Sequence, residues 1–265
     1  MCTIIVRHRM DDFCSTIIAS NRDEFYDRAA SGPRVLRVDP LVVGGRDERE
    51  GGTWFGLSRG GLFVGLTNQR SFGARDDSLR SRGGLVLDAL AEGSLEGVER
   101  YLRGVDPVAY NEFNLIFGDG NELRAAYGRR DAREVEIETL ADGVHVLCND
   151  RLGSPEFPKA EKARVRVMAV PPDTWPRIKR QLVEVLSDGS LPDPSEVPPI
   201  PPDAPFDQEV ARYLQAICVE TPVYGTVSST IAAVSPGRVE QYWFSDGPPS
   251  ETSFEDMLSL TQGPE

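Results

Sequence analysis

The sequence has few of the residues that metal centres, disulfide frameworks and imidazole-assisted nucleophiles require. Its 265 residues include four cysteines and two histidines, which are Cys2, Cys14, Cys148, Cys218, His8 and His145. No two cysteines have C-x-x-C spacing, which argues against a zinc or dithiol redox motif. Four scattered cysteines in a chain of this length indicate reduced thiols, so we expect a cytoplasmic protein without a disulfide scaffold.

The sequence also lacks the signals of a membrane or nucleic-acid-binding protein. No apolar run approaches the ~18 residues that a membrane-spanning helix needs. The apolar run from Ile4 to Val6 is followed at once by Arg7, His8 and Arg9, so a secretory signal peptide is not expected. The formal net charge of −13 argues against nucleic acid or an anionic membrane, because both need a basic surface. We expect a small-molecule ligand, no nucleic acid and no membrane insertion, with no signal for an oligomeric state.

The scarcity of histidine limits the bases available to a cysteine nucleophile. His145 and Cys148 lie three residues apart in an alternating stretch, so in a strand their side chains face opposite ways. His8 is six residues from Cys2, some 20 Å along a strand at ~3.3 Å per residue. Either histidine could therefore approach Cys2 only through tertiary folding.

Cys2 could carry its own base. Removal of Met1, usual before a small second residue, would leave Cys2 with a free α-amine that takes the proton of the attacking thiol. A free thiol has a pKa near ~8.5 and an α-amine one near ~7.7–8.0, so the transfer costs less than about 1 kcal/mol. Taken alone, the position of Cys2 favours a small buried apolar residue, which is a frequent role of free cysteine, over a nucleophile.

Hydrophobic periodicity predicts an α+β protein with antiparallel sheets and helices segregated outside them. Strands are expected at residues 3–8, 15–20, 41–43, 53–57, 62–66, 113–117, 122–127, 135–140, 144–147, 223–233 and 238–244, and helices at 85–92, 95–103, 158–168, 176–186 and 207–217. A four-layer αββα sandwich fits this order, although periodicity alone does not select it. We expect one domain over residues 1–250, a loop at 191–205 with seven prolines, and a polar tail at 251–265.

A polar cluster follows the second predicted strand and is a candidate neighbour of Cys2. A short turn joins the first two strands, so antiparallel pairing would place Cys2 beside residues 21–23. Arg22 would lower the pKa of the thiol, and Asp23 could orient the terminal ammonium. In a regular strand these two side chains face opposite ways, so both serve Cys2 only if the strand breaks there. The alternative is a solvated charged turn.

Two asparagines and one tryptophan are further candidates. Asn68 and Asn149 each end a predicted strand, where asparagine commonly forms turns, and near a thiol both amides could donate to an oxyanion. Trp54 follows a glycine pair and either lines a pocket or fills the core. Trp54 and Asn21 are our candidates for substrate binding, and Cys2 with Arg22, Asp23, Asn68 and Asn149 are the catalytic candidates.

Seven sequence blocks occur in an order that resembles the NRDE family, also called the transport-and-Golgi-organisation protein 2 family. The blocks are Met1-Cys2-Thr3-Ile4-Ile5-Val6, Asn21-Arg22-Asp23-Glu24-Phe25, Gly44-Gly45-Arg46-Asp47, Gly51-Gly52-Thr53-Trp54-Phe55-Gly56, Gly65-Leu66-Thr67-Asn68, Ser81-Arg82-Gly83 and Tyr110-Asn111-Glu112-Phe113-Asn114-Leu115. The likeness runs from residue 1 to about 160 and resumes at residues 224–230. The resemblance implies an N-terminal-nucleophile hydrolase-like αββα fold with Cys2 as nucleophile.

A more distant likeness to the choloylglycine-hydrolase amidases implies roles for Arg22, Asp23, Asn68 and Asn149. Those amidases use an N-terminal cysteine, an Arg and Asp after the second strand, and oxyanion-site asparagines. Their second arginine has no counterpart that we can place in this sequence. The expected activity is hydrolysis of an amide C–N bond, or of a thioester, without a cofactor. The alternative is a non-catalytic protein that binds or carries haem, an acyl-lipid or acyl-CoA.

Overall fold

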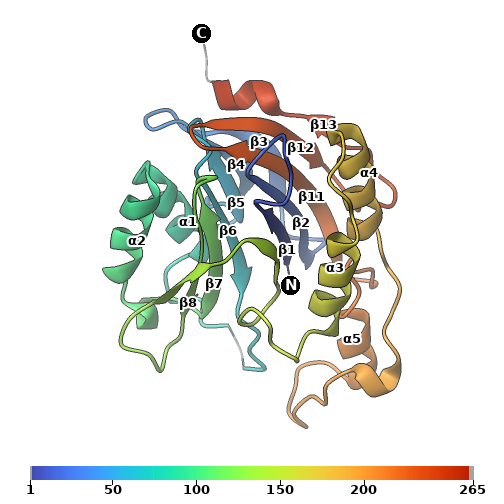
Figure 1. Ribbon diagram of the computed structural model, residues 1–265. Coiled ribbons are helices and arrows are strands. Elements are labelled where there is room, and N and C mark those ends of the chain that lie inside the picture. The colour runs from blue at the N-terminus through green and yellow to red at the C-terminus, as the bar shows by residue number, and fades with distance from the viewer. Residues whose placement is uncertain (1, 74, 263–265) are drawn as a thin grey trace.

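The computed structural model describes residues 2–73 and 75–262, and its strands form two antiparallel sheets (Figure 1). Sheet A contains, in spatial order, β10 (Gly143–Leu147), β1 (Thr3–His8), β2 (Thr16–Phe25), β11 (Tyr224–Ser235), β12 (Arg238–Ser245) and β13 (Glu255–Asp256). Sheet B contains β3 (Ala30–Arg37), β4 (Val42–Asp47), β5 (Phe55–Ser58), β6 (Phe63–Asn68), β7 (Phe113–Gly118), β8 (Leu123–Gly128) and β9 (Glu136–Leu140).

Two pairs of helices cover the outer faces of the two sheets (Figure 1). Helices α1 (Arg82–Ala91) and α2 (Leu95–Arg103) share a buried apolar cluster with sheet B, and α3 (Pro158–Met168) and α4 (Trp175–Leu186) share another with sheet A. A third cluster, with Ile4, Ile18 and Phe55, lies between the sheets. The alternation of strand side chains between two faces supplies both apolar surfaces. The α+β class and the four-layer αββα sandwich are confirmed.

Local sequence signals fix most helix ends. Ser94 caps α2 through a hydrogen bond that its side chain accepts from Gly97 N, and Gly104 ends that helix, as the sequence predicts. Ser81 caps α1 in the same way. Pro158 begins α3, where its missing N–H costs nothing. The expected helix at 207–217 is shorter, because α5 spans only Gln208–Tyr213.

Three segments depart from or add to the expected secondary structure. The strand expected at 15–20 continues to Phe25, so the polar cluster lies within β2 instead of after it. Strand β3 is exposed over much of its length, and its lack of an apolar run hid it from periodicity. The expected polar tail contains β13, paired with β12, and a 3-10 helix, η3 (Leu258–Gln262), beside the inter-sheet cluster. Residues 263–265 lie outside the described residues.

The remaining short elements are two 3-10 helices. These are η1 (Pro107–Ala109) and η2 (Pro194–Glu196), and the second interrupts the proline-rich loop at 191–205. Among the described residues, no helix has the length and apolar character that crossing a membrane requires.

Candidate active site

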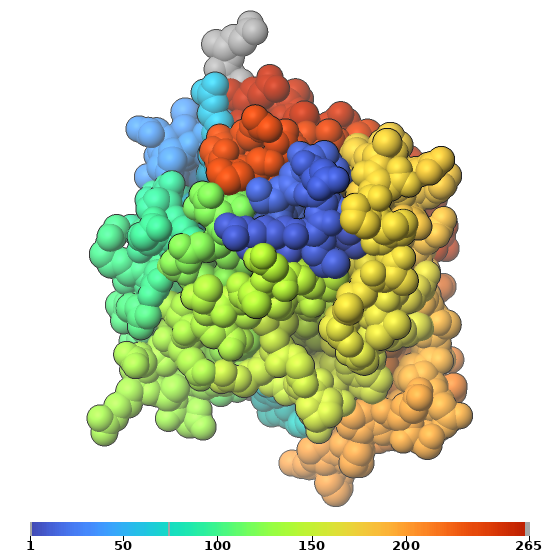
Figure 2. Space-filling view, in the orientation of Figure 1, coloured from blue at the N-terminus to red at the C-terminus, as the bar shows by residue number. Residues whose placement is uncertain are grey.

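The first strand places Cys2 beside the polar cluster, as the hairpin argument predicts. Strand β1 pairs antiparallel with β2, and Thr3 lies opposite Asn21. Strand β2 in turn pairs with β11, so the start of the chain is held inside sheet A. Figure 2 shows the N-terminal segment in blue, enclosed by green, yellow and orange-red segments that are distant in sequence. The position of Cys2 therefore depends on tertiary contacts from both ends of the chain.

Cys2 lines a polar cleft of about 690 Å³, a volume that includes its opening to solvent. The cleft joins the start of β1 to the start of α1 and to the loops of sheet B. Its lining residues are Cys2, Arg22, Asp23, Glu24, Arg28, Asp47, Glu50, Thr53, Trp54, Leu66, Asn68, Arg75, Arg80, Ser81, Arg82, Gly83 and Asn111. The lining therefore contains Cys2, Arg22, Asp23, Asn68 and Trp54 from our candidates.

Arg22 and Asp23 both reach the cleft although β2 does not break. The irregularity lies in the neighbouring strand, where the register of β11 shifts between Thr226 and Ser228 opposite these residues. The Arg22 guanidinium lies 4.4 Å from the ring centroid of Trp54 and 3.9 Å from Glu24. The expected break in β2 is therefore absent, and a bulge in β11 takes its place. The alternation of residues in β2 could not predict a bulge in another strand.

Asp23 has a buried partner that the sequence analysis missed. Lys159, near the start of α3, has a fully buried side chain whose Nζ lies 3.7 Å from Asp23 Oδ2. Thr226 Oγ1 donates a 2.7 Å hydrogen bond to Asp23 Oδ1. Burial raises the pKa of the Asp23 carboxyl, while Lys159 and the Thr226 hydrogen bond act in the opposite direction. Lysine is rare in this chain, with three residues, but no local pattern marks Lys159 as buried.

The surroundings of Cys2 favour the neutral thiol over the thiolate. Burial raises its pKa, and the Asp23 carboxylate acts in the same direction. The backbone hydrogen bond from Asp23 and the charge of Arg22 oppose this shift without reversing it. An attacking Cys2 would therefore need a base to accept its proton, and neither His8 nor His145 lines the cleft.

The three asparagine candidates have different surroundings. Asn68 lines the cleft. Asn149 is buried beside it, is not a lining residue, and its Nδ2 donates a 2.6 Å hydrogen bond to the backbone oxygen of Asn68. Asn21 Nδ2 donates to the backbone oxygens of Leu186 and Ile217, at 2.9 and 2.8 Å, on the helix-covered side. The structure therefore places Asn68 in the cleft lining, Asn149 behind it in hydrogen-bond contact with its backbone, and Asn21 away from the cleft lining.

Two glycine motifs bring the walls of the cleft together. A Cβ atom on Gly52 would lie 2.3 Å from the backbone carbon of Gly83, so only glycine allows this approach. Thr53 N donates a 3.1 Å hydrogen bond to Gly83 O across the same contact. A Cβ on Gly45 would lie 2.3 Å from the Trp54 ring, which covers that glycine. These contacts fix the start of α1 and Trp54 relative to β4.

Known proteins resemble this chain both in sequence and in structure. The family described as Transport and Golgi organisation 2 matches residues 1–242. A Transport and Golgi organization protein 2 homolog from Bos taurus is 33% identical over 235 residues, covering 82% of this chain and 81% of that protein. The Homo sapiens homolog is 31% identical over 242 residues, with the same coverage of both chains.

Solved structures share the fold at low sequence identity. A Caenorhabditis elegans N-acylethanolamine-hydrolyzing acid amidase ortholog has a TM-score of 0.53 and 17% identity, covering 88% of this chain and 92% of its own. A conjugated bile acid hydrolase variant from Clostridium perfringens has a TM-score of 0.57 and 12% identity, covering 100% and 95%. The fold is therefore that of the N-terminal-nucleophile hydrolases. The match over residues 1–242 shows that the chain belongs to the Transport and Golgi organisation 2 family.

Proposed function

We propose that this protein hydrolyses an amide bond of a small molecule, with Cys2 as the nucleophile after removal of Met1. The observation that carries the proposal is the convergence of Cys2, Arg22, Asp23 and Asn68 on one cleft. The two structural neighbours described above are named as hydrolases, one of N-acylethanolamines and one of conjugated bile acids. Their likeness supports amide hydrolysis as the reaction class. The substrate of this chain depends on the residues of its own cleft.

The chemistry would proceed in two balanced steps. In the first, the Cys2 sulfur attacks the carbonyl carbon and its proton passes to the α-amine of the same residue. Collapse of the tetrahedral intermediate breaks the C–N bond, and the α-ammonium returns the proton to the departing amine. In the second, water attacks the resulting thioester, releases the acid and regenerates the thiol. A thioester substrate would follow the same course with a thiol as leaving group.

The neighbours of Cys2 have distinct roles in this scheme. Asp23 would accept hydrogen bonds from the α-amine and orient it. Lys159 already offsets the Asp23 charge, so it disfavours a second cation there and favours the neutral amine that can act as a base. The Asn68 amide would donate to the oxyanion, which is typically worth ~2.7–4 kcal/mol in the transition state. Arg22 would stabilise the negative charge that forms on sulfur or oxygen.

Binding without turnover is the second outcome to distinguish. The cleft lining among the described residues offers one thiol, Cys2, and no histidine or methionine. Any haem coordinated by the side chains of this lining would therefore use Cys2 as its axial ligand. A haem titration with and without Cys2 would show a Soret shift that depends on this residue.

The proposal is tested by hydrolysis of a panel of fluorogenic N-acyl amides. Cys2→Ala should lower kcat/KM by at least about 10³-fold, because nucleophile and base are lost together. The matched control is Cys218→Ala, which removes a buried thiol that does not line the cleft. Equal activity of the wild type and Cys2→Ala would contradict the proposal, whereas a Cys2-dependent Soret shift without turnover would favour the binding role.

A further inference from the structure

The cleft contains five arginines whose charges are balanced unequally. Four of them have a carboxylate oxygen within 4.0 Å, and these pairs are Arg22–Glu24 at 3.9 Å, Arg28–Asp47 at 2.6 Å, Arg75–Glu50 at 3.0 Å and Arg80–Asp88 at 3.8 Å. Arg82 has no such carboxylate within the ranges 2–73 and 75–262 that the structure describes. Its guanidinium is therefore the exception in a cleft where positive charge is otherwise compensated locally.

The fold holds Arg82 firmly at this place. It is the first residue of α1, directly before Gly83, whose backbone packs against Gly52 and accepts a hydrogen bond from Thr53 N. Arg82 Nη1 donates a 3.1 Å hydrogen bond to the backbone oxygen of Glu112. This bond uses one of the five N–H donors of the guanidinium, and no other acceptor for them is found among the described residues, so they can serve a ligand.

The electrostatic surroundings compensate the Arg82 cation only weakly. Burial lowers the pKa of Arg82 to about 10, and the positive charge of Arg75 acts in the same direction. The Glu24 carboxylate acts in the opposite direction without reversing the shift, and arginine remains protonated at neutral pH. A Cys2 thiolate would raise the same pKa, which places sulfur and guanidinium in one electrostatic environment.

We propose that Arg82 binds an anionic group, a carboxylate or a phosphate, on the molecule that occupies the Cys2 cleft. A guanidinium offers a planar donor fork that matches both groups, and a partly desolvated one gains most from a charged partner. The net charge of −13 repels anions at long range, so an anionic ligand needs a local positive site. This inference rests on the proposed function for its substrate class, which becomes an amide that carries a carboxylate or phosphate.

The test compares two small alkylating reagents that differ mainly in charge. Iodoacetate and iodoacetamide both transfer an alkyl group to a thiolate with loss of iodide, and peptide mapping assigns the rate to Cys2. We expect Arg82→Gln to lower the ratio of the iodoacetate rate to the iodoacetamide rate by roughly three- to tenfold, the effect of one nearby charge. Arg82→Lys, which keeps the charge, should restore most of the ratio. Arg100→Gln on α2 is the matched control, since its side chain is 74% exposed and outside the cleft.

A second arm does not depend on Cys2 reactivity. In a Cys2→Ala background, acetate or inorganic phosphate added at constant ionic strength should raise Tm, and Arg82→Gln should abolish the rise. The anion that raises Tm more shows whether the site prefers a carboxylate or a phosphate. If both reagents alkylate Cys2 and Arg82→Gln leaves their ratio unchanged, the inference is overturned. If neither reagent alkylates Cys2, the proposal that Cys2 is the nucleophile fails. The anion titration then decides the inference about Arg82, and an unchanged Tm would overturn it.

Discussion

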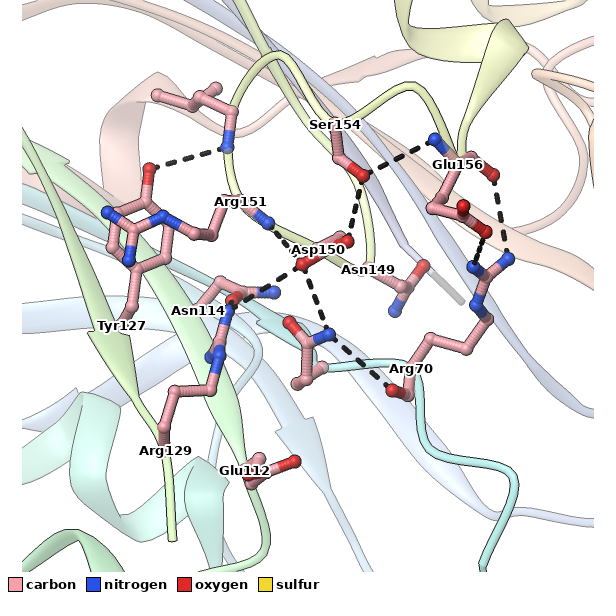
Figure 3. Close-up of polar contacts among 12 residues, drawn as sticks. Arg70, Glu112, Asn114, Tyr127, Arg129, Asn149, Asp150, Arg151, Ser154 and Glu156 are labelled. Carbon is pink, nitrogen blue, oxygen red and sulfur yellow. Dashed lines mark hydrogen bonds and ion pairs between the residues drawn. The ribbon is translucent and has the colours of Figure 1, made fainter. Parts of the chain in front are cut away.

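The Cys2 cleft and the loop around Asp150 are both rich in arginine, but they differ in how their charges are satisfied. Asp150 accepts hydrogen bonds from Gln69 Nε2 at 3.1 Å, Arg151 N at 2.8 Å and Ser154 Oγ at 2.8 Å, and Arg70 pairs with Glu156 at 2.6 Å (Figure 3). In the cleft, Arg82 lacks a carboxylate partner among the residues the structure covers, and the Asp23–Lys159 pair is fully buried. The balanced network stabilises a loop, whereas the unbalanced cleft retains charge that can act on a ligand.

The largest expected effect concerns the buried pair beneath Cys2. Lys159→Met should lower the free energy of unfolding by about 3–5 kcal/mol, because it removes the buried cation that offsets the charge of the Asp23 carboxylate. The measurement is urea unfolding at neutral pH. Lys162→Met on the same helix removes a partly exposed pair with Asp188 and should cost no more than about 1 kcal/mol.

The pH dependence of that loss has a definite sign. Burial raises the pKa of Asp23 in the folded protein above its unfolded value. Such a carboxyl lowers stability above its unfolded pKa, and this cost disappears as the pH falls through the folded pKa. Lys159→Met enlarges the cost, so its destabilisation should be greater at about pH 8 than at about pH 5. A loss that does not change with pH would show that Lys159 acts through packing alone.

The second prediction compares an asparagine in the cleft with an asparagine outside it. If Asn68 donates to an oxyanion, Asn68→Ala should lower kcat by about 10²–10³-fold with little change in Tm. Asn121→Ala, in the turn before β8, should leave kcat unaltered. Steady-state kinetics on the best amide of the panel provides the measurement, and a rise in KM alone would assign Asn68 to binding.

The smallest effect is expected in the balanced network. Asp150→Asn should lower the free energy of unfolding by about 1–3 kcal/mol while leaving the alkylation rate of Cys2 unchanged. Burial opposes ionisation of Asp150, but its hydrogen bonds from Ser154, Arg151 and Gln69 together hold its pKa below the ordinary range. This stability is present above the unfolded pKa and is lost as the pH falls through the folded one, so the variant and wild type should converge below about pH 4. Asp142→Asn, at a side chain 64% exposed, is the control.

The sequence predicted the parts of the fold that local patterns encode. The hairpin argument placed Cys2 beside residues 21–23, and the register of β1 with β2 confirms that placement. The strands expected at 223–233 and 238–244 correspond to β11 and β12. Asn68 was a candidate oxyanion donor and Trp54 a candidate for either a pocket or the core, and both line the cleft.

The rest of the site depends on contacts that no local pattern contains. Lys159 reaches Asp23 only because α3 covers sheet A, and its sequence neighbourhood is that of an ordinary amphipathic helix. Arg82 enters the cleft through the approach of Gly83 to Gly52, which are 31 positions apart. Asn21 shares a polar cluster with Arg22 but points to the opposite face, since successive residues of a strand do so.

The central claim is that Cys2 is a chain-terminal nucleophile in the cleft, and intact mass analysis tests it most directly. The mass of the intact purified protein is measured before and after a short treatment with iodoacetamide, and the site of alkylation is mapped. The account predicts a mass without Met1 and a single alkylation at Cys2, because the three other thiols are buried. A protein that keeps Met1, or that reacts first at another cysteine, would contradict it.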